Sequence, residues 1–568
     1  MKLPSLSPST WGSVLLGLTS VVHAAGPFLQ PLTPTSKTGW VIGNDLWNIT
    51  IGDVYGKKLF YKGRDLIGGA VGFYSGYDGE LNFQWTSASI AHQGTDYIDV
   101  VFESTQVDFH WVIYANLPGA YQYITNKALP ELGVLRSLFR LDNGTFTTGR
   151  TSIKDAALPA YADILAATNV QDETWQRADG SYITKYDFSA PIRDIDFHGV
   201  YGPGFGSWFI RPGRDYFNGN HLKQELTVHR ETKTGDAVEL NVVHGSHFQV
   251  NSQATFAEGK IWGPWLWYLN DGSKDDASAR SKQEFSAWPY AFLQDAAYQS
   301  RGSVSGSLTL SNGAPAANAS VFLGDNNSNV TTLDQGAAYY YAGTTDSEGS
   351  FTIANVRTGS YALYAWSNGG ALASVETTLT KNDVVVSNKK TTVVGDLTWQ
   401  LSGKQRIWQI GAIDRKATGF KNGGGPYTHG LAAQSPANLT YTIGTSATHD
   451  WYYAQSAIGT WRVVFNLPAA ASRTKTATLS LALAGYSKSS DLVISVNGVQ
   501  VGSLITANLA SDPALYRSGT TAGEWRLYQF TVPAGTLKPG VVNEVDLRIT
   551  RYTLWRGWLW DSVFLDWN

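Results

Sequence analysis

The alternation of apolar and polar residues with a period of two is the feature that most limits how this chain can fold. In the stretch VDFHWVIYANL, the side chains expected on one face of a strand are Val107, Phe109, Trp111 and Ile113. Successive side chains of a strand point to opposite faces, so this spacing predicts a strand with one buried face. Similar runs recur to about Leu293, whereas helical periodicity is scarce. We therefore predict an all-β protein that begins with a large antiparallel β-sandwich over residues 26–298.

Two further modules are expected after a change of composition near residue 299. The segments SVSGSLTLSNGAPAANASVFLG and GSFTIANVRTGSYALYAW predict a compact sandwich over residues 299–393, close to the usual size of such folds. The remainder, 394–568, contains Asn497-Gly498, a pair typical of a type I′ hairpin turn, and ends on the aromatic strand TLWRGWLWDSVFLDWN. We predict a jelly roll for this third module.

Composition narrows the class of protein. The 568 residues include 21 Trp, 29 Tyr and 23 Phe, only 16% are charged, and the net charge is −3. Aromatic-rich, charge-poor sequences suit extracellular β proteins that stack sugars on ring faces, and a general nucleic-acid binder would carry a broad basic field. The chain has no cysteine, which excludes disulfides, thiolate metal sites and a cysteine nucleophile.

The first 25 residues resemble a secretory signal peptide. One early lysine precedes a short apolar run around Val14 to Val22, and the small residues Ala24 and Ala25 follow. The run is too short to span a bilayer. We therefore expect a secreted protein that is not anchored in a membrane. Sequons compatible with glycosylation begin at Asn48, Asn143, Asn318, Asn326, Asn329 and Asn438.

Cationic and histidine side chains gather in the first domain. They are Arg136, Arg140, Lys185, Arg193, His198, His221, Lys223, His229, His244 and His247. Taken singly, each is explained equally well as a solvated or structural group. The pair in HGSH could share a metal ion, but strand geometry would put the two rings on opposite faces, and no acidic residue nearby completes a ligand set. No metal site is predicted.

The order of several short motifs identifies a resemblance. TKYDFS, HGVYG, LKQELTVH, LNVVHGSHF and IWGPWLWYLN run in sequence, and GSFTIANVRTGSYALYAW, IWQIGAIDRKATGF and LTYTIGTSATHDWYYAQ follow. Together they resemble the rhamnogalacturonan endolyases of polysaccharide lyase family 4 over nearly the whole mature chain. The resemblance implies cleavage of the rhamnose–galacturonic acid backbone of pectin by β-elimination. It also implies a catalytic sandwich, a fibronectin-III-like middle domain and a carbohydrate-binding-like jelly roll.

The chemistry of elimination explains which residue types such a site needs. The proton at C5 of galacturonate lies next to a carboxylate, so cations or hydrogen-bond donors must stabilise the charge that develops there. A base with a pKa near the working pH takes the proton, and a donor protects the O4 leaving group. Lysine can be the base where burial or neighbouring cations lower its pKa. The resemblance implies Lys185 in ITKYDFS as this base, Arg136 in GVLRSLFR as a substrate contact and Tyr268 in WLWYLN as a wall of the cleft.

The proton donor is where the sequence departs from the family pattern. The resemblance implies a histidine a few residues after WLWYLN, and Ser273 stands there instead. We take His247 as the first candidate for the donor, with His198 and His244 in reserve as residues of the same binding site. Arg193 remains open between a contact to the substrate carboxylate and a pair with a neighbouring aspartate, Asp194 or Asp196.

The remaining expectations concern the cofactors, the binding partners and the alternative functions of the protein. Catalysis should need no cofactor, although carbohydrate-binding jelly rolls often hold a structural calcium ion, which is kept as an alternative. The partner is a polysaccharide, with no nucleic acid and no membrane, and a monomer is expected. A glycoside hydrolase would need two carboxylates across the bond, and the available groups are Asp194, Asp215 and Glu225. A non-catalytic polysaccharide-binding protein is the third alternative.

Overall fold

A computed structural model describes residues 26–33, 38–79, 81–192, 195–217, 224–248, 255–327, 339–425, 428–505, 509 and 512–568. The expected signal peptide lies outside the described residues. So do some of the side chains and one sequon singled out above, namely Arg193, Asp194, His221, Lys223 and Asn329. Among the described residues, the helices are all too short or too polar to cross a membrane.

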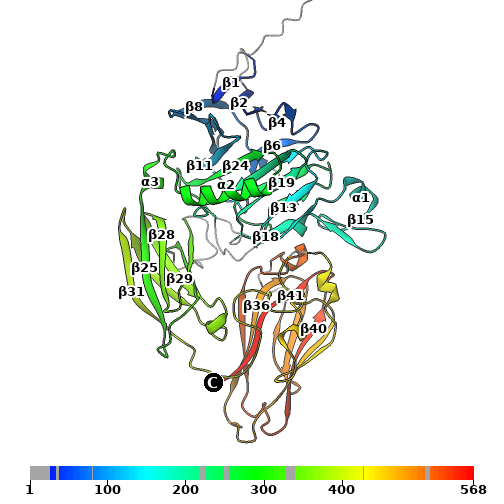
Figure 1. The fold of residues 1–568 in the computed structure, drawn as a ribbon. Helices are drawn as coiled ribbons and strands as arrows, with labels where there is room; N and C mark the ends of the chain where they lie inside the picture. Colours follow the sequence, from blue (N-terminus) through cyan, green and yellow to red (C-terminus); the bar gives the residue numbers. More distant parts are fainter. Residues whose placement is uncertain are drawn as a thin grey trace, which may run out of the picture.

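The first domain is a sandwich of two large, mostly antiparallel sheets (Figure 1). One sheet has the order β1 (Phe28–Pro31), β2 (Trp40–Gly43), β3 (Trp47–Ile51), β4 (Gly56–Tyr61), β6 (Gly72–Tyr77), β12 (Leu135–Leu141), β23 (Ala237–His244) and β22 (Val228–Arg230). Two short strands extend it, β5 (Arg64–Asp65) on β4 and β7 (Leu81–Asn82) on β6. The other sheet has the order β14 (Asp155–Ala157), β13 (Thr148–Arg150), β19 (Phe197–Gly202), β20 (Phe205–Ile210), β24 (Ile261–Asn270), β11 (Gly119–Asn126), β10 (Val107–Tyr114), β9 (Tyr97–Glu103) and β8 (Ser87–Gln93).

Aromatic side chains fill the space between these sheets. The four residues predicted to share one face of β10 all lie in this core, so that prediction is confirmed. Phe139 of β12 stacks on Trp267 of β24 with ring centroids 4.5 Å apart, and Phe73 of β6 meets Trp111 edge to face at 4.9 Å. Such pairs add about 0.5–1.5 kcal/mol each beyond the burial of their area. A chain without disulfides is stabilised here by the size of its core.

Smaller elements surround the sandwich. Helix α2 (Lys274–Ala287) contacts β19, β20 and β24, and covers a second apolar cluster on the outer face of their sheet. Several small elements lie near the sheet that contains β22 and β23. They are the helix α1 (Tyr161–Ala166) and a three-stranded sheet of β15 (Thr168–Gln171), β16 (Thr174–Gln176) and β17 (Tyr182–Thr184). The single turn η1 (Lys185–Phe188) and the paired strands β18 (Ser189–Pro191) and β21 (Gln224–Leu226) follow. Helix α3 (Ala296–Gln299) leads into the middle domain.

The middle domain is a small sandwich of two sheets. One has the order β28 (Ser350–Arg357), β25 (Arg301–Leu310) and β31 (Thr391–Trp399); the other has β27 (Tyr341–Thr344), β26 (Ser320–Asp325), β29 (Gly359–Trp366) and β30 (Leu379–Val386). A single turn, η3 (Gly370–Leu372), follows β29. The boundary expected at residue 393 falls inside β31, because the parallel pairing of β31 with β25 continues to Trp399.

The third domain is also a two-sheet sandwich. Its sheets have the orders β32 (Gln405–Ile410), β41 (Gly557–Trp567), β36 (Ala477–Ser487) and β39 (Arg526–Val532), and β33 (Leu439–Thr442), β35 (Gly459–Asn466), β40 (Val542–Arg551), β37 (Asp491–Val496) and β38 (Val499–Leu504). Strand β34 (Ala454–Gln455) pairs with β41, and the single turns are η4 (Leu431–Gln434), η5 (Thr448–Asp450) and η7 (Leu515–Arg517). Asn497 and Gly498 have φ of 49° and 78° between β37 and β38, which confirms the type I′ turn.

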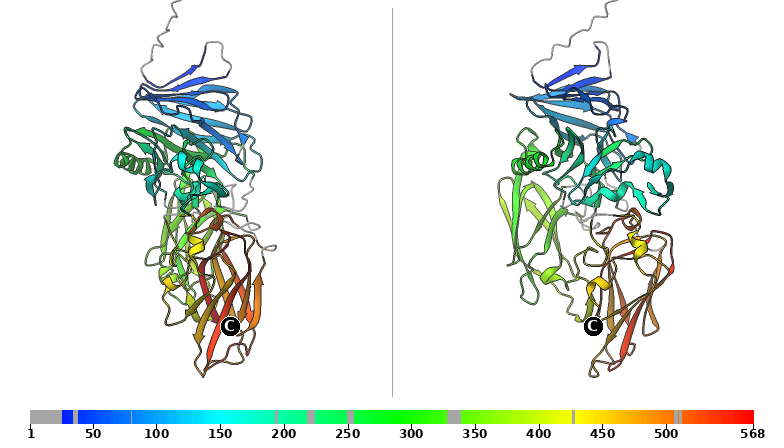
Figure 2. Two further views of the ribbon diagram at one scale, coloured as in Figure 1. Left: turned by 90° about the vertical axis from the view of Figure 1, so that its right-hand side faces the viewer. Right: turned by 45° about the vertical axis from the view of Figure 1, so that its right-hand side comes forward.

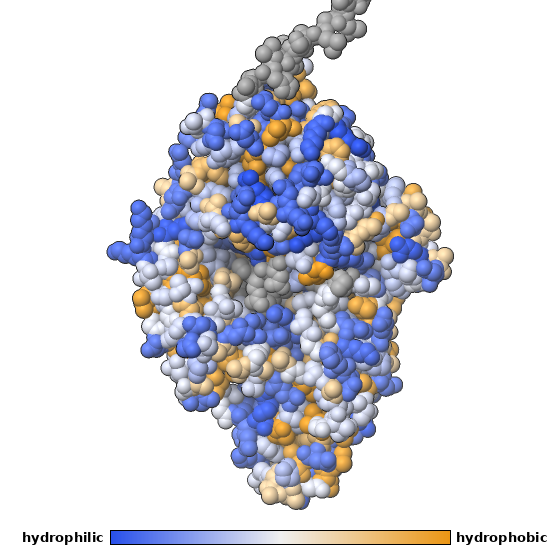
Figure 3. Space-filling model, viewed as in Figure 1, coloured by the Kyte–Doolittle hydropathy of each residue, from blue (hydrophilic) through white to orange (hydrophobic). Residues whose placement is uncertain are grey.

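The two smaller sandwiches lie side by side beneath the first domain (Figures 1 and 2). On the face drawn in Figure 3, hydrophobic residues are scattered among hydrophilic ones and form no broad patch. The first and middle domains meet at Asp215, whose buried carboxylate accepts from Arg301 at 3.1 Å and Arg357 at 3.0 Å. These contacts hold the middle domain against the first.

Candidate active site

A cavity of about 580 Å³ opens on the outer face of the sheet that contains β6, β12, β22 and β23. Its side chains come from several elements far apart in the chain. They are Tyr55, Val71, Tyr74, Asn82, Arg136, Leu138, Arg140, Glu173, Lys185, Leu226, His229, Glu231, Lys233, Thr234, Leu240 and His247, with Gly79 at the edge. Cations, carboxylates and two histidines thus share one pocket.

Strand alternation explains which residues face the cavity. Along β12, Leu138 points into the pocket while its neighbour Phe139 points into the core. Leu138 pairs with Leu240 of β23 on one side and with Tyr74 of β6 on the other. Paired residues of neighbouring strands lie on the same face of a sheet, so the register aligns the pocket floor across three strands. Arg136 and Arg140, each two residues from Leu138, therefore also face the cavity.

Lys185 enters the pocket from η1, directly after β17. The hydroxyl of Thr184 accepts from the backbone N–H of Tyr186, which fixes the start of this turn. The Lys185 side chain is 21% exposed, and its Nζ lies 4.0 Å from Glu173 Oε1. Burial lowers the pKa of the Lys185 amine, although the carboxylates around it act in the opposite direction. The lysine is thus biased toward the neutral form that a base requires.

His229 and Glu231 form the second polar group of the pocket. They are two residues apart at β22, so both face the cavity, and His229 Nε2 lies 3.8 Å from Glu231 Oε2. The guanidinium of Arg140 lies 3.2 Å from the same carboxylate oxygen and donates from Nε to Tyr74 Oη at 3.1 Å. Burial opposes ionisation of Glu231, but His229, Arg140 and Lys185 together hold its pKa well below the usual range. Burial also lowers the pKa of His229, against the effect of Glu231.

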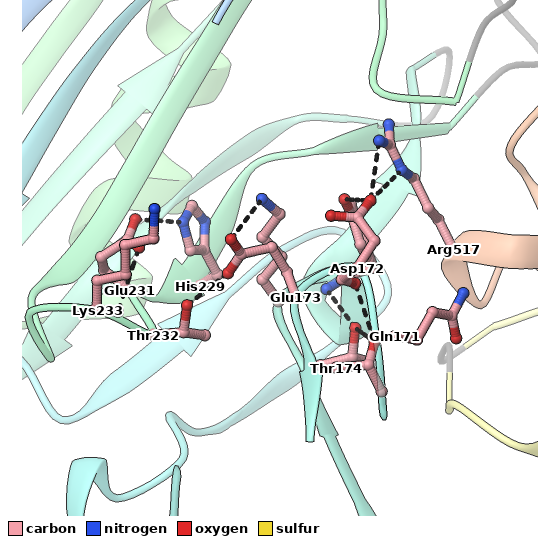
Figure 4. Close-up of polar contacts among 12 residues, drawn as sticks. Gln171, Asp172, Glu173, Thr174, His229, Glu231, Thr232, Lys233 and Arg517 are labelled. Atoms are coloured by element: carbon pink, nitrogen blue, oxygen red, sulfur yellow. Dashed lines mark hydrogen bonds and ion pairs between the residues drawn. The ribbon is translucent and has the colours of Figure 1, made fainter. Parts of the chain in front are cut away.

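Glu173 joins the lysine to the histidine group. Its Oε2 accepts from the hydroxyl of Thr232, the residue after Glu231, while its Oε1 faces Lys185 (Figure 4). Figure 4 shows His229 and Glu231 on one side of Glu173, with Asp172 and Arg517 on the other. Glu173 therefore contacts both Lys185 and Thr232, and Thr232 directly follows Glu231, the partner of His229.

Arg136 and His247 also reach the pocket. One guanidinium nitrogen of Arg136 donates to Gly79 O, and its buried Nε has no hydrogen-bond partner among the described residues. Burial lowers the pKa of this guanidinium. His247 follows β23 and has its Nδ1 3.0 Å from Glu225 Oε1, a carboxylate with no exposed surface. Three of the residues expected from the sequence, Lys185, Arg136 and His247, are therefore brought together.

Tyr268 is not part of this pocket, and its expected place on the cleft wall is a prediction that the structure does not support. Along β24, Trp267 points into the sandwich core, so Tyr268 points to the opposite face, under α2. Its hydroxyl donates to Asp276 at 2.8 Å. Ser273 lies at the same face and caps α2 by accepting from Asp276 N at 3.2 Å. A histidine at position 273 would thus lie on the far side of the sandwich from Lys185.

His198 and His244 also lie outside the cavity. His198, on β19, is fully buried between the two sheets, where its Nε2 bonds to Leu240 O at 2.9 Å. Burial holds the pKa of His198 well below its usual value, so this ring is a neutral part of the core. His244 is the last residue of β23 and packs edge to face on Phe256 at 4.9 Å. Both were expected to be substrate contacts, but His198 belongs to the opposite sheet and His244 packs against Phe256, so neither lines this cavity.

The carboxylates proposed for a hydrolase are not arranged as a catalytic pair among the described residues. Asp215 is enclosed in the interdomain ion cluster, and Glu225 is buried behind His247. The acidic residues that do line the pocket are Glu173 and Glu231. Sequence reasoning missed Glu231 and gave His229 no role. The motif HRE carried a usable signal, because a histidine and a glutamate two apart in a strand share a face.

Comparison with known proteins places this architecture in a family. Family models described as "Polysaccharide lyase family 4, domain II" and "Polysaccharide lyase family 4, domain III" match residues 300–394 and 406–565. A rhamnogalacturonate lyase of Dickeya dadantii is 33% identical over 78% of this chain and 76% of its own length. A probable rhamnogalacturonate lyase B of Aspergillus terreus is 25% identical over 74% of this chain and 70% of its own. The chain belongs to polysaccharide lyase family 4.

Proposed function

We propose that the protein cleaves the rhamnose–galacturonic acid backbone of rhamnogalacturonan by β-elimination in the pocket around Lys185. One observation carries this proposal: a half-buried lysine with a lowered pKa faces the same cavity as Arg136, Arg140 and a histidine–glutamate pair. The relatives named above are lyases of this substrate. A pocket with several cations suits a sugar acid.

Each step of the elimination has a group to perform it. Lys185 Nζ takes the proton from C5, and the electrons of that C–H bond form the C4–C5 double bond as the C4–O4 bond breaks. Arg136, with buried donors facing the cavity, stabilises the negative charge that spreads over the C6 carboxylate. A protonated His229 gives its proton to O4. The products are an unsaturated galacturonate and a new free hydroxyl.

His229 is the better donor of the two histidines in the pocket. Glu231, 3.8 Å away, favours the imidazolium form, in opposition to burial, which lowers the pKa of His229 overall. After each turnover, Lys185 holds a proton and His229 lacks one, so both groups exchange a proton with solvent before the next turnover. His247 is held by a buried carboxylate instead. We therefore assign His247, our first candidate from the sequence, to the pocket wall.

The test is the ultraviolet absorbance of the unsaturated uronate formed from rhamnogalacturonan. Lys185→Ala and His229→Ala should each lower kcat by about 10²–10⁴-fold with unchanged melting temperature, and His247→Ala should lower it by less than about tenfold. New reducing ends without absorbance would identify a hydrolase, and retention on pectin without cleavage would identify a binding protein. Near-normal turnover of Lys185→Ala would overturn the assignment of the base.

The remaining expectations are part of the same proposal. The side chains supply base, acid and cations, so catalysis should need no cofactor, and the absorbance assay should give equal rates with and without EDTA. A structural calcium ion would instead appear as a lower melting temperature in EDTA. Secretion is supported by the leader-like residues 1–25, and a monomer is expected as well. Amino-terminal sequencing of protein from culture medium and light scattering of the purified protein test these two points.

A further inference from the structure

The third domain reaches the edge of the pocket through one arginine. Arg517, the last residue of η7, lies with Nη2 3.0 Å and Nε 3.1 Å from Asp172 Oδ2 (Figure 4). Its remaining terminal nitrogen donates to the backbone oxygen of His247. The guanidinium carbon also lies 5.2 Å from the ring centroid of Tyr186. One side chain of the third domain thus contacts three segments of the first.

These contacts surround Lys185 on both sides. Asp172 and Glu173 form the turn between β15 and β16, and Glu173 adopts a left-handed φ of 48° there. The backbone N–H of Lys185 donates to Glu173 O at 3.2 Å, and the Lys185 amine faces the Glu173 carboxylate. Tyr186, directly after the lysine, donates its hydroxyl to Asp172 Oδ2 at 3.0 Å. The oxygen that Arg517 binds is therefore the oxygen that fixes the residue next to the lysine.

We propose that Arg517 is a positioning residue for Lys185, and hence that the third domain completes the active site of the first. The arginine holds the Asp172–Glu173 turn against η1 and balances the charge of Asp172. This inference rests on the proposed function, in which Lys185 is the base. It assigns the third domain a direct part in catalysis in addition to any binding of polysaccharide.

Charge gives this proposal a signature that packing alone would not produce. Titratable and charged groups surround Lys185 on several elements: Asp172, Glu173, Glu225, His229, Glu231, Lys233, Arg136, Arg140, Tyr55, Tyr74, Tyr186, His247 and Arg517. Among them, Asp172 raises the pKa of the lysine and Arg517 lowers it. The base must be neutral to act, so the acid limb of the pH–rate profile follows the pKa of Lys185.

Removing one charge at a time should therefore move that limb in opposite directions. In Arg517→Ala, the Asp172 carboxylate is left unbalanced, so the acid limb of kcat should move to higher pH by about half a unit. In Asp172→Asn, the arginine is left unbalanced, and the limb should move to lower pH. The double variant should return it close to the wild-type position. Misplacement of the lysine should also lower the plateau of kcat in Arg517→Ala by about tenfold or more.

Two further variants keep the test decisive. Arg517→Lys keeps the charge without the paired contact. The acid limb of its pH–rate profile should therefore lie at the wild-type pH, but its maximal kcat should be only partly restored. Arg551→Ala removes an exposed arginine of the same domain, 4.0 Å from Asp491, and should change neither. If Arg517→Ala does not fold, Arg517→Lys and Asp172→Asn carry the test.

The outcomes separate this inference from the proposed function. If Lys185→Ala is inactive but the Arg517 and Asp172 variants keep the wild-type profile, or shift it in the same direction, the positioning role is overturned and the lyase assignment stands. A lower melting temperature with an unchanged profile would also overturn it, because that is the result of a purely structural contact. If Lys185→Ala retains turnover, the proposed function falls first.

Discussion

Environment, more than residue type, decides what each histidine of the first domain does. His229 faces a cavity beside an ionised carboxylate, His247 is tied to a buried one, and His198 is sealed between two sheets. The same imidazole therefore serves as a proposed acid, a pocket wall and a core residue. Desolvation lowers the pKa of all three, and only the neighbours of each ring differ.

Tyr268 allows a prediction at the scale of one residue. Tyr268→Phe removes a hydroxyl that donates to Asp276 under α2, so we expect the free energy of unfolding to fall by about 1 kcal/mol with kcat and KM unchanged. Denaturant unfolding and the absorbance assay measure the two effects. Tyr74→Phe is the matched variant inside the pocket: it removes the acceptor of Arg140 Nε and should lower kcat/KM. A large loss of kcat in Tyr268→Phe would contradict this assignment.

At the scale of elements, two-residue spacing builds the site and a helix cap explains the departure from the family pattern. Strands β12 and β22 each bring residues two apart to one face, which places Arg136, Arg140, His229 and Glu231 over the same cavity. Ser273 belongs to α2 on the opposite side of the sandwich. The two histidines that line the pocket, His229 and His247, come from other parts of the chain.

The cap of α2 can be tested directly. Ser273→Ala removes the acceptor for Asp276 N, and loss of such a cap costs about 1 kcal/mol. We expect a lower melting temperature and an unchanged kcat. Ser273→Asp is the control, because aspartate is an equally good cap and should keep the wild-type melting temperature. A fall in kcat for Ser273→Ala at constant stability would place this position in the site after all.

At the scale of the whole molecule, buried charge joins the first domain to the middle one. Asp215 lies between Arg301 and Arg357, and removing it would leave two buried guanidinium groups without a counter-charge. Asp215→Asn should therefore lower the free energy of unfolding by about 3–5 kcal/mol. The melting temperature measures this, and Asp546→Asn, in a more exposed pair with Arg462, should cost under about 1 kcal/mol. Equal effects of the two changes would contradict the role of the cluster.

The same carboxylate predicts a dependence on pH. Burial opposes its ionisation, but Arg357 and Arg301 outweigh burial and hold the pKa of Asp215 below its usual value. Its contribution to stability is therefore present above the pKa of an unfolded aspartate and is lost as the pH falls through the lower folded value. The melting temperature of Asp215→Asn should consequently vary less with acidic pH than that of the wild type.

The local pattern of the sequence was enough to predict the class of fold and several of its details. The buried face of β10 and the turn at Asn497-Gly498 follow from side-chain alternation and from the positive φ that this pair tolerates. These two features depend on neighbours in the chain, so a single sequence contains them. The family resemblance, and not local pattern, led to Lys185 and Arg136, which share a cavity.

The tertiary structure alone decided which other side chains join them. Tyr268 and His198 lie on strands of the sheet opposite the cavity, and His244 packs against Phe256 at the end of β23. His229 and Arg517 come from β22 and from another domain, at positions that no local pattern connects with Lys185. The reason is physical: alternation along a strand shows which residues share a face, but only the packing of sheets and domains determines which groups that face contacts.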